Sequence, residues 1–387
     1  AVRGGLAFAL SGGVDADYNQ LLGIGPFVAN IAGTAYSSVK DLQRLSGMEQ
    51  NSPSSPMSFL VDLHSAGAGA DGRAVPLPEV TTDIDGEPRD ANAPDIGADE
   101  YSPQTSGLNG NYVIGEGKDF PDLQSAGEAL HLLGIQGPVT FEVQPGTYGG
   151  LYLSEVDGAS AASPVTFRSQ TGRSEDVLLE FTWSNDIRHL IHLNGSDHLR
   201  FDRLTFQGVL TQYWYGVMHL QGDADNLSIT NCLFETSPEG EVGILLRTFA
   251  DTSAAADNLL LKGNRFVRGP VILYGHVTTP MRNTRVDDNR FVADSLVYYQ
   301  LNMTDHESPV VQFNNMVGRG ITTWYLGLHV VASQSIQVSN NRIRALGIEN
   351  SQGIRLAPIV GESTTASLVN NFIVADRWGT ITTDQRF

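Results

Sequence analysis

The sequence predicts an all-β fold, a solenoid in which short strands stack in parallel coils, and two observations support this prediction. First, one eight-residue pattern recurs between positions 190 and 376: apolar, any, apolar, any, small or polar, Asn, any, apolar. Second, the repeats follow one another at a nearly fixed distance, which is the signature of a solenoid. Aligned on the Asn position, the column reads Leu204, Cys232, Asn264, Asn289, Asn315, Asn341 and Asn371, with spacings of 28, 32, 25, 26, 26 and 30 residues.

Each repeat has the alternation of a β-strand. Apolar residues such as Leu227 and Ile229 are separated by polar ones, which is the period of a strand rather than of a helix. The alternation stops at Asn, a residue that tolerates the left-handed backbone of a sharp turn. Coils of this length stack in parallel at roughly 4.8 Å, as a parallel β-helix. Stacked amides then bond along the axis, so the sequence predicts a ladder of Asn264, Asn289, Asn315, Asn341 and Asn371.

Two short helices are predicted ahead of the repeats. Residues 37–47 form one, with Ser37 or Ser38 as its cap. Asp119 is expected to cap a second, amphipathic helix near 120–134, whose apolar stripe needs a partner that the open end of the solenoid supplies. A helix at that end also prevents exposed strand edges from recruiting other chains. The apolar faces are Val39, Leu42 and Leu45 in the first helix, and Leu123, Ala126, Leu130 and Leu133 in the second.

Two further stretches resemble a known family. TTDIDGEPRDANAPDIGADEY (81–101) resembles the closing segment, and GKDFPDLQSAGEALHLLGIQGPVTFEVQPGTYGG (117–150) the opening segment, of right-handed parallel β-helix repeat proteins of the pectate-lyase-like superfamily. With the coils, the resemblance covers nearly the whole chain. It implies a right-handed β-helix of the kind found as repeats in large bacterial secreted and surface proteins, and therefore an extracellular location. It is specific for the fold and says little about activity.

The order of these segments predicts three parts. Residues 1–102 are expected to be the last coils and closing cap of one β-helix unit, 103–116 a linker, and 117–387 a second β-helix that has its capping helix but no closing segment of its own. Read cyclically, 103–387 followed by 1–102 would make one whole domain. This suggests a repeat of a giant surface protein or a protomer that joins head to tail in a filament. An arbitrarily cut piece is the alternative.

Charge and composition exclude several classes of partner. The chain has 43 acidic against 24 basic residues, a net charge of −19, which disfavours nucleic acid and anionic membrane surfaces. Its single cysteine, Cys232, excludes an internal disulfide framework. The sequence contains no run of 18 apolar residues, so membrane insertion is not expected. No cofactor is required by these patterns.

An acidic stretch surrounds Arg89. Asp83, Asp85, Asp95 and Asp99 alternate with other residues, and closely spaced oxygen ligands on a loop suit Ca²⁺. The alternative is an end cap in which Arg89 pairs with one or two of the carboxylates. The spacing matches no EF-hand or nonapeptide calcium pattern. The sequence therefore leaves both a calcium site and a structural cap open.

Outward positions of one strand column are candidates for catalysis. His192 and His219 are 27 residues apart and are expected to stack on adjacent coils. Beside Arg247 such a pair could bind or deprotonate a uronate, as in a polysaccharide lyase or glycoside hydrolase acting on an acidic glycan. No Asp or Glu joins this column, which favours a surface ladder. The expected column also includes Tyr274 and His276, and a second basic stripe of Arg265, Arg290 and Arg342 is expected to pair with acidic turn residues.

Aromatic residues at the starts of coils suggest glycan binding, because rings on a flat extended face can stack on sugars. The candidates are Trp214, Tyr274, Trp324 and Tyr325. We therefore expect an extracellular structural or adhesive β-helix unit whose partners are further copies of itself and an extracellular polysaccharide. A lyase or hydrolase and a non-catalytic glycan-binding module are the alternatives.

Overall fold

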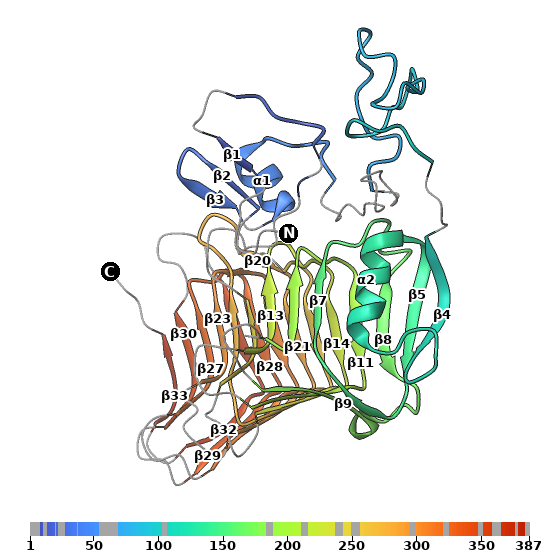
Figure 1. Cartoon of the computed structure of the whole chain (residues 1–387). Helices are drawn as coiled ribbons and strands as arrows, with labels where there is room; N and C mark the ends of the chain where they lie inside the picture. Colours follow the sequence, from blue (N-terminus) through green and yellow to red (C-terminus); the bar gives the residue numbers. More distant parts are fainter. Residues whose placement is uncertain are drawn as a thin grey trace.

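The chain folds into a right-handed parallel β-helix, as a computed structural model shows (Figure 1). Three long parallel sheets run along the axis, and successive coils contribute one strand to each sheet in turn. The predicted fold class is confirmed. The described residues are 8–10, 14–19, 21, 28–36, 38–53, 69–102, 107–182, 189–209, 216–236, 243–248, 256–293, 299–319, 325–346, 351–357, 365–375 and 378–383.

The three long sheets are named first, second and third in the order in which a coil meets them. The first contains β7 (Leu151–Ser154), β10 (Ile191–Asn194), β13 (Gly216–Gln221), β16 (Ile244–Thr248), β19 (Val271–Tyr274), β23 (Tyr299–Thr304), β27 (Tyr325–Val331), β30 (Ser351–Ala357) and β33 (Trp378–Thr383). The second contains β4 (Leu108–Ile114), β5 (Ile135–Val143), β8 (Val165–Ser169), β11 (Leu199–Asp202), β14 (Ser228–Thr230), β17 (Leu260–Lys262), β21 (Arg285–Asp287), β25 (Val310–Gln312), β28 (Ile336–Ser339) and β31 (Ala366–Val369). The third contains β6 (Gly146–Tyr148), β9 (Val177–Thr182), β12 (Thr205–Val209), β15 (Leu233–Thr236), β18 (Arg265–Val267), β22 (Arg290–Ala293), β26 (Asn315–Arg319), β29 (Arg342–Leu346) and β32 (Phe372–Ala375).

Smaller elements accompany the solenoid. Two α-helices, α1 (Val39–Ser46) and α2 (Leu123–Leu133), and a 3-10 turn at Ser174–Asp176 are described. Neither of these two helices has the length and apolar run that crossing a membrane would require. The remaining strands are β1 (Phe8–Leu10), β2 (Ala29–Ile31) and β3 (Thr34–Tyr36) in one small sheet, and β20 (Met281–Arg282) with β24 (His306–Glu307) in another.

The core consists of like residues stacked from coil to coil. Parallel in-register pairing places each inward side chain over its counterpart, for example Phe167 over Phe201 and Phe206 over Phe234. The ring centroids of Phe206 and Phe234 are 4.6 Å apart, and the stack continues through Phe266 to Phe291. Each fully buried Phe stabilises the fold by roughly 2–3 kcal/mol. Stacking adds about 0.5–1.5 kcal/mol for each ring pair.

The Asn ladder lies at the turn between the second and third sheets. In each rung the side-chain nitrogen of one Asn donates to the side-chain oxygen of the next, at 3.1 Å from Asn264 to Asn289 and 3.0 Å from Asn341 to Asn371. The same oxygen accepts the backbone N–H of the first Asn, and the nitrogen also donates to a strand carbonyl, as from Asn289 to Leu261. Buried amides are thus satisfied from coil to coil.

One predicted member of the ladder is wrong. Asn314, not Asn315, accepts from Asn289 and donates to Asn341, both at 3.0 Å. The residue before each ladder position adopts a positive φ, and here that residue is Phe313, with φ 56°. Because Asn favours this conformation and Phe does not, the sequence pointed to Asn314 as the turn residue. Asn315 is instead paired with Arg290 in the third sheet.

Helix α2 covers the edge of the first sheet and buries the predicted stripe, including Leu123 and Leu130. Asp122, rather than the predicted Asp119, caps it with a capping box, while Asp119 accepts from the backbone N–H of Val113. Two α2 side chains act as a neighbouring strand would. Gln124 Oε1 accepts from Tyr152 N at 3.0 Å, and His131 Nε2 accepts from Ser154 N at 3.0 Å, so alternate N–H groups of edge strand β7 are satisfied.

The predicted linker is also wrong over its described part. Residues 108–114 form β4, which pairs in parallel with β5 at the end of the second sheet. The strand lacks a clear apolar alternation, because Asn109, Gly110 and Asn111 are followed directly by Tyr112, Val113 and Ile114. The solenoid therefore begins ahead of α2. That 1–102 forms the last coils and cap of a separate unit stays a prediction.

Helix α1 and the small sheet of β1, β2 and β3, which we call the N-terminal unit, lie against turns of the solenoid (Figure 1). Helix α1 starts after Ser38 and ends at Gly47, as predicted. Lys40 bridges Glu155, at 3.2 Å, and Asp197, and Arg44 lies 3.4 Å from Asp223. Burial raises the pKa of Glu155 to about 7 and that of Asp223 to about 8, although the neighbouring cations oppose both shifts.

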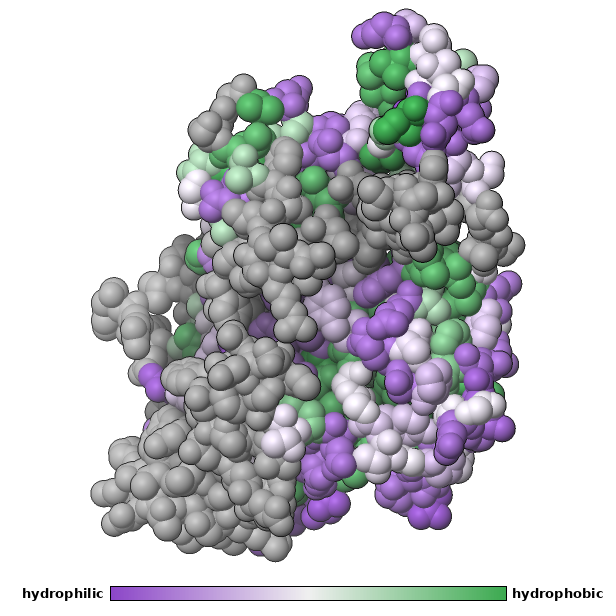
Figure 2. All heavy atoms as spheres, viewed as in Figure 1, coloured by the Kyte–Doolittle hydropathy of each residue, from purple (hydrophilic) through white to green (hydrophobic). Residues whose placement is uncertain are grey.

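Residues 69–102 form a turn-rich segment that stands out beyond α2 (Figure 1). Arg73 joins it to the solenoid through a 2.7 Å ion pair with Asp157. Apolar side chains are exposed on this segment, and Figure 2 shows them as green spheres at the upper right. They are Val75, Leu77, Val80 and Ile84.

Replacing a ladder residue tests the role of the Asn column. Asn289→Ala leaves the backbone N–H of Asn264 without its acceptor and removes an amide that joins three coils. We expect a loss of about 1–3 kcal/mol in the free energy of unfolding, measured by urea denaturation. Asn315→Ala, one residue beyond the ladder, is the control. Equal losses for the two variants would refute the assigned register.

The His131 contact predicts acid sensitivity. Burial lowers the pKa of His131 to about 4 from an ordinary 6.5. Its contribution to stability is therefore fully present above pH 6.5 and is lost as the pH falls towards 4, by up to about 3 kcal/mol. His131→Gln keeps an acceptor that does not titrate, and it should lose less stability over this interval in pH-dependent denaturation. Parallel curves for the two proteins would contradict the assignment.

Candidate functional site

The outer side of the first sheet carries a row of polar side chains, one in most coils. In register order the row is Tyr152, His192, His219, Arg247, Ile272, Asn302, His329 and Arg355. A parallel row two positions further along each strand contains Asn194, Gln221, Tyr274 and Thr304. We call the two rows together the polar face. It follows from the period of two, which sends alternate side chains of each strand outward.

The strands of this sheet carry no carboxylate. The described strands of the first sheet, which begins with β7 and ends with β33, contain no Asp, Glu or Lys, while Arg247 and Arg355 supply two positive charges. The whole chain has a net charge of −19. The polar face is therefore a neutral to basic strip on an acidic protein.

The predicted column is partly correct. His192, His219 and Arg247 are paired in register on adjacent strands, as expected. The next position in their row is Ile272, whereas Tyr274 lies two residues further and belongs to the second row. His276 is in the turn after β19, where its ring nitrogen contacts the Thr278 hydroxyl at 2.8 Å. Tyr274 and His276 therefore do not extend the histidine row.

Three histidine rings meet at one end of the polar face. His189 stacks on His219 with ring centroids 4.3 Å apart and an angle of 11°, and His192 meets His219 edge to face at 5.1 Å. Burial lowers the pKa of His192. Burial, and then the nearby His189, His192 and Arg247, hold the pKa of His219 well below its usual value. Both His192 and His219 are therefore neutral near pH 7.

A hydrogen bond fixes the proton on His192. Its Nε2 lies 3.0 Å from the Gln221 side-chain oxygen, which can only accept, so Nε2 carries the proton. The other ring nitrogen, Nδ1, then has a lone pair. Tyr152, which is 37% exposed, meets the His192 ring edge to face at 5.1 Å. This end of the face thus offers one acceptor nitrogen beside an exposed aromatic ring.

A second polar group lies further along the same face. Asn302 is buried, and its Nδ2 donates to the Tyr274 hydroxyl at 3.1 Å. Its Oδ1 accepts from His329 Nδ1 at 3.0 Å, so Nδ1 carries a proton. Tyr299 stacks on the His329 ring at 5.3 Å and 15°. Asn302 therefore orients a hydroxyl and an imidazole that are both half-buried.

The predicted glycan-contacting aromatics fare differently. Tyr325 is fully buried, and its hydroxyl donates to Gln300 at 2.7 Å, so it is a core residue and not a sugar contact. Because Tyr325 directly follows Trp324, the alternation of the sequence does not show which of the two rings points inward. Trp214 and Trp324 lie outside the described residues. Tyr274 is half-buried on the polar face.

Sequence reasoning missed two members of the second group, Asn302 and His329, and named Tyr299 only as one of several aromatic residues at the starts of coils. Each lies on an outward position of a strand, and the apolar alternation around His329 was a usable signal. Their alignment with His192 required the register across loops of unequal length, which the repeat pattern did not provide. His189 was missed because it precedes its strand.

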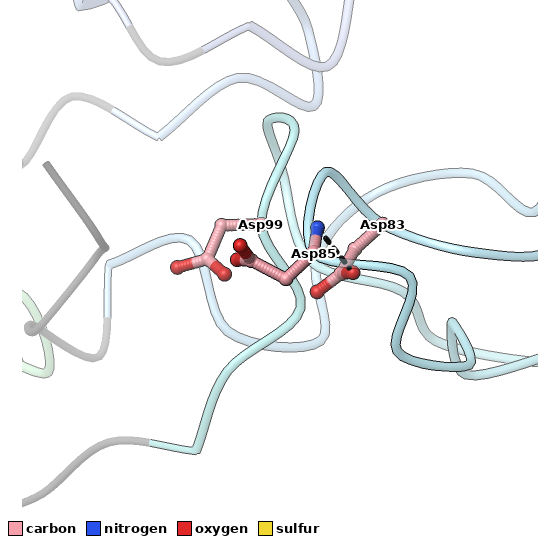
Figure 3. A group of neighbouring side chains, drawn as sticks. All are labelled: Asp83, Asp85 and Asp99. Atoms are coloured by element: carbon pink, nitrogen blue, oxygen red, sulfur yellow. Dashed lines mark hydrogen bonds between the residues drawn. The ribbon is translucent and has the colours of Figure 1, made fainter.

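The acidic loop brings three of its four predicted ligands together. Oxygens of Asp83, Asp85 and Asp99 lie within 4.8 Å of one another, the one such group among the described residues (Figure 3). Asp95 is separate: it is buried and accepts from the backbone N–H groups of Gly72 and Tyr101. Asp83 also accepts from Asp85 and Glu87 backbone N–H groups, as a structural turn residue would. Arg89 pairs with Glu100 at 3.3 Å.

Similar folds occur among solved structures. No protein-family model matches the chain, and no curated protein does. A pectin methylesterase from Aspergillus niger is 12% identical, with a TM-score of 0.40, over 70% of this chain and 88% of that protein. Escherichia coli YbhC is 10% identical, with a TM-score of 0.37, over 71% of this chain and 88% of that protein. The PL6 family alginate lyase AlyGC is 11% identical, with a TM-score of 0.35, over 84% of this chain and 47% of that protein. These likenesses concern the fold.

The calcium prediction has a direct test. Asp85→Asn removes one candidate ligand, and Asp71→Asn makes the same charge change at an exposed site outside the group. If Ca²⁺ binds, millimolar Ca²⁺ should raise the thermal unfolding midpoint of the unchanged protein and of Asp71→Asn but not of Asp85→Asn. A midpoint that is independent of Ca²⁺ and of EDTA would leave the loop as a structural cap.

Proposed function

We propose that the protein is an extracellular adhesive β-helix that holds a polysaccharide chain along its polar face without cleaving it. The observation that supports this most is the absence of carboxylates from the described strands of the first sheet, together with its oriented neutral acceptors. Polysaccharides present hydroxyl groups at regular intervals. A row of His, Asn, Tyr and Gln side chains can donate to and accept from them.

The geometry suits a chain lying along the solenoid axis. Coils repeat at roughly 4.8 Å, which is similar to the length of one pyranose in an extended chain. His192 Nδ1 can accept a hydrogen bond, His329 supplies an oriented imidazole, and Tyr274 supplies an oriented hydroxyl. His219 and Asn302 are buried, so they position these groups and do not make the contacts themselves. Flanking rings of Tyr152 and Tyr299 provide apolar surface for the faces of sugars.

Catalysis is the alternative. Hydrolysis of a glycoside bond needs a pair of carboxyl groups, and the described strands of this sheet contain none. Elimination from a uronate would need a base beside a cation, and neutral His219 next to Arg247 has that chemistry. His219 is only 5% exposed, however, which favours a supporting role. We therefore propose binding, and the experiment below measures cleavage as well.

The location and assembly belong to the same proposal. An adhesive unit of this kind would work outside the cell, which the resemblance to repeats of bacterial surface proteins supports. Head-to-tail association of copies remains a prediction. Electron microscopy of the purified protein at rising concentration would reveal filaments.

Substitutions on the polar face test the binding proposal. Asn302→Ala removes the side chain that orients both the Tyr274 hydroxyl and the His329 ring, and we expect binding to weaken at least about tenfold, or about 1.4 kcal/mol. The measurement is affinity electrophoresis of the whole chain in gels containing a neutral glucan, a mannan or a polyuronate. Gln337→Ala, exposed on β28 of the second sheet, is the control.

The same polysaccharides are assayed for new reducing ends and for unsaturated uronate. Binding that Asn302→Ala and Gln337→Ala alter equally would contradict the proposed site. Depolymerisation that His219→Gln abolishes would replace the binding proposal by the lyase alternative.

A further inference from the structure

A row of arginines runs along the outer face of the third sheet. Arg265 on β18 is paired in register with Arg290 on β22, which is paired with Asn315 and then with Arg342 on β29. All three arginines are exposed. Arg265 and Arg290 lie on adjacent coils and Arg342 lies two coils further, and each follows the Asn of its ladder position by one residue. We call them the arginine row.

The expected pairing with acidic turn residues is wrong. No carboxylate lies within 4.0 Å of any of the three guanidinium groups in the described part of the chain, where the other ion pairs include Arg168 with Glu142 and Arg282 with Glu307. Asp287 precedes Arg290 by three residues, but its carboxylate is paired with Arg285 on the second sheet, at 3.6 Å. The arginine row therefore has its charge available to solvent.

The surroundings of the row contain little that would neutralise it. The described strands β18, β22, β26, β29 and β32 contain no Asp or Glu. Glu235 on β15, the strand next to β18, is paired in register with Val267 and accepts from Gln207 Nε2, and Glu180 lies two strands further, on β9. Asp288, in the turn before Arg290, is the exposed carboxylate closest in sequence. On a protein of net charge −19, this is a local concentration of positive charge.

An apolar row runs beside the arginines. Val267, Val292 and Val317 are stacked in register two positions further along the same strands and are half-buried. At the end of the arginine row, Phe372 is 57% exposed, and the Arg342 guanidinium carbon lies 5.9 Å from its ring centroid. The face thus carries a row of positive charge and, parallel to it, a row of apolar side chains.

This arrangement fits a linear polymer with regularly spaced anions. Arg265 and Arg290 are one coil apart, roughly 4.8 Å, and Arg342 is two coils beyond Arg290. Guanidinium groups bind carboxylate or sulfate groups through two parallel hydrogen bonds. The valine row can lie under the apolar face of a sugar ring.

We propose that the arginine row is a binding site for a linear anionic polysaccharide that carries carboxylate or sulfate groups. It is separate from the polar face, which lies on another sheet and offers mainly neutral hydrogen-bonding groups. The two sites therefore differ in how they respond to salt. Binding at the arginine row weakens as ionic strength rises, because exposed charges are screened.

The test compares two double variants of the whole chain with equal changes of charge. Arg265→Gln with Arg290→Gln removes the adjacent pair, and Arg200→Gln with Arg203→Gln removes two exposed arginines at β11 of the second sheet. Binding to polygalacturonate, dextran sulfate, uncharged dextran and single-stranded DNA is measured at several salt concentrations. Thermal unfolding of each variant verifies that it is folded, and Arg265→Lys with Arg290→Lys keeps the charge without the bidentate geometry.

We expect the first variant to bind at least one anionic polysaccharide about tenfold or more weakly, with a shallower salt dependence, and the second variant to match the unchanged protein. The lysine variant should fall in between. Which polymer responds, polygalacturonate or dextran sulfate, identifies carboxylate or sulfate as the preferred group. Equal weakening in both glutamine variants, or DNA binding as tight as that of the polysaccharides, would overturn the proposal. Arg265→Gln with Arg290→Gln should leave the binding of uncharged dextran unchanged, so the two sites can fail independently.

Discussion

In-register stacking of parallel coils is the constraint on which the rest of this structure depends. Each residue has its counterpart in the next coil as a neighbour, so a side chain is tolerated only if it can lie against a copy of itself or a partner of similar kind. Phenylalanines satisfy this condition inside, where rings stack at 4.6–5.5 Å. Asparagines satisfy it at the turn, because an amide both donates and accepts. The ladder therefore sets the register of the two sheets that flank it.

The outer faces inherit this register. Side chains that are far apart in sequence come together as rows: His192, Asn302 and His329 on the first sheet, and the arginine row on the third. The turns differ from these two faces in being acidic. Asp197, Asp225 and Asp257 follow one another from coil to coil, and each carboxylate accepts a hydrogen bond from a backbone N–H of the next coil. The acidic excess of the chain is thus concentrated at turns, and Lys40 of the N-terminal unit binds at one end of that acidic series.

The sequence predicted the fold well because the same pattern, a strand alternation that ends at Asn, occurs in coil after coil. It predicted the Asn ladder with an error of one residue, since Phe313 adopts a backbone conformation that its neighbour Asn314 would favour. It was less informative about the faces. Alternation cannot assign adjacent aromatic residues, so Tyr325 was placed outside although its ring is in the core. Loops of unequal length before the first sheet obscured the alignment of Tyr274, and no local signal distinguishes a paired arginine from an unpaired one.

Helix α2 has a consequence for the direction in which the first sheet can be extended. Gln124 and His131 occupy the N–H groups that an incoming strand would need at β7, so this edge cannot accept a further strand. The opposite edge, at β33, has no such cover among the described residues. The sheet is therefore directional. Any lengthening of the polar face has to proceed from the β33 side, and β33 cannot pair with β7 of a second copy, because α2 of that copy covers this edge.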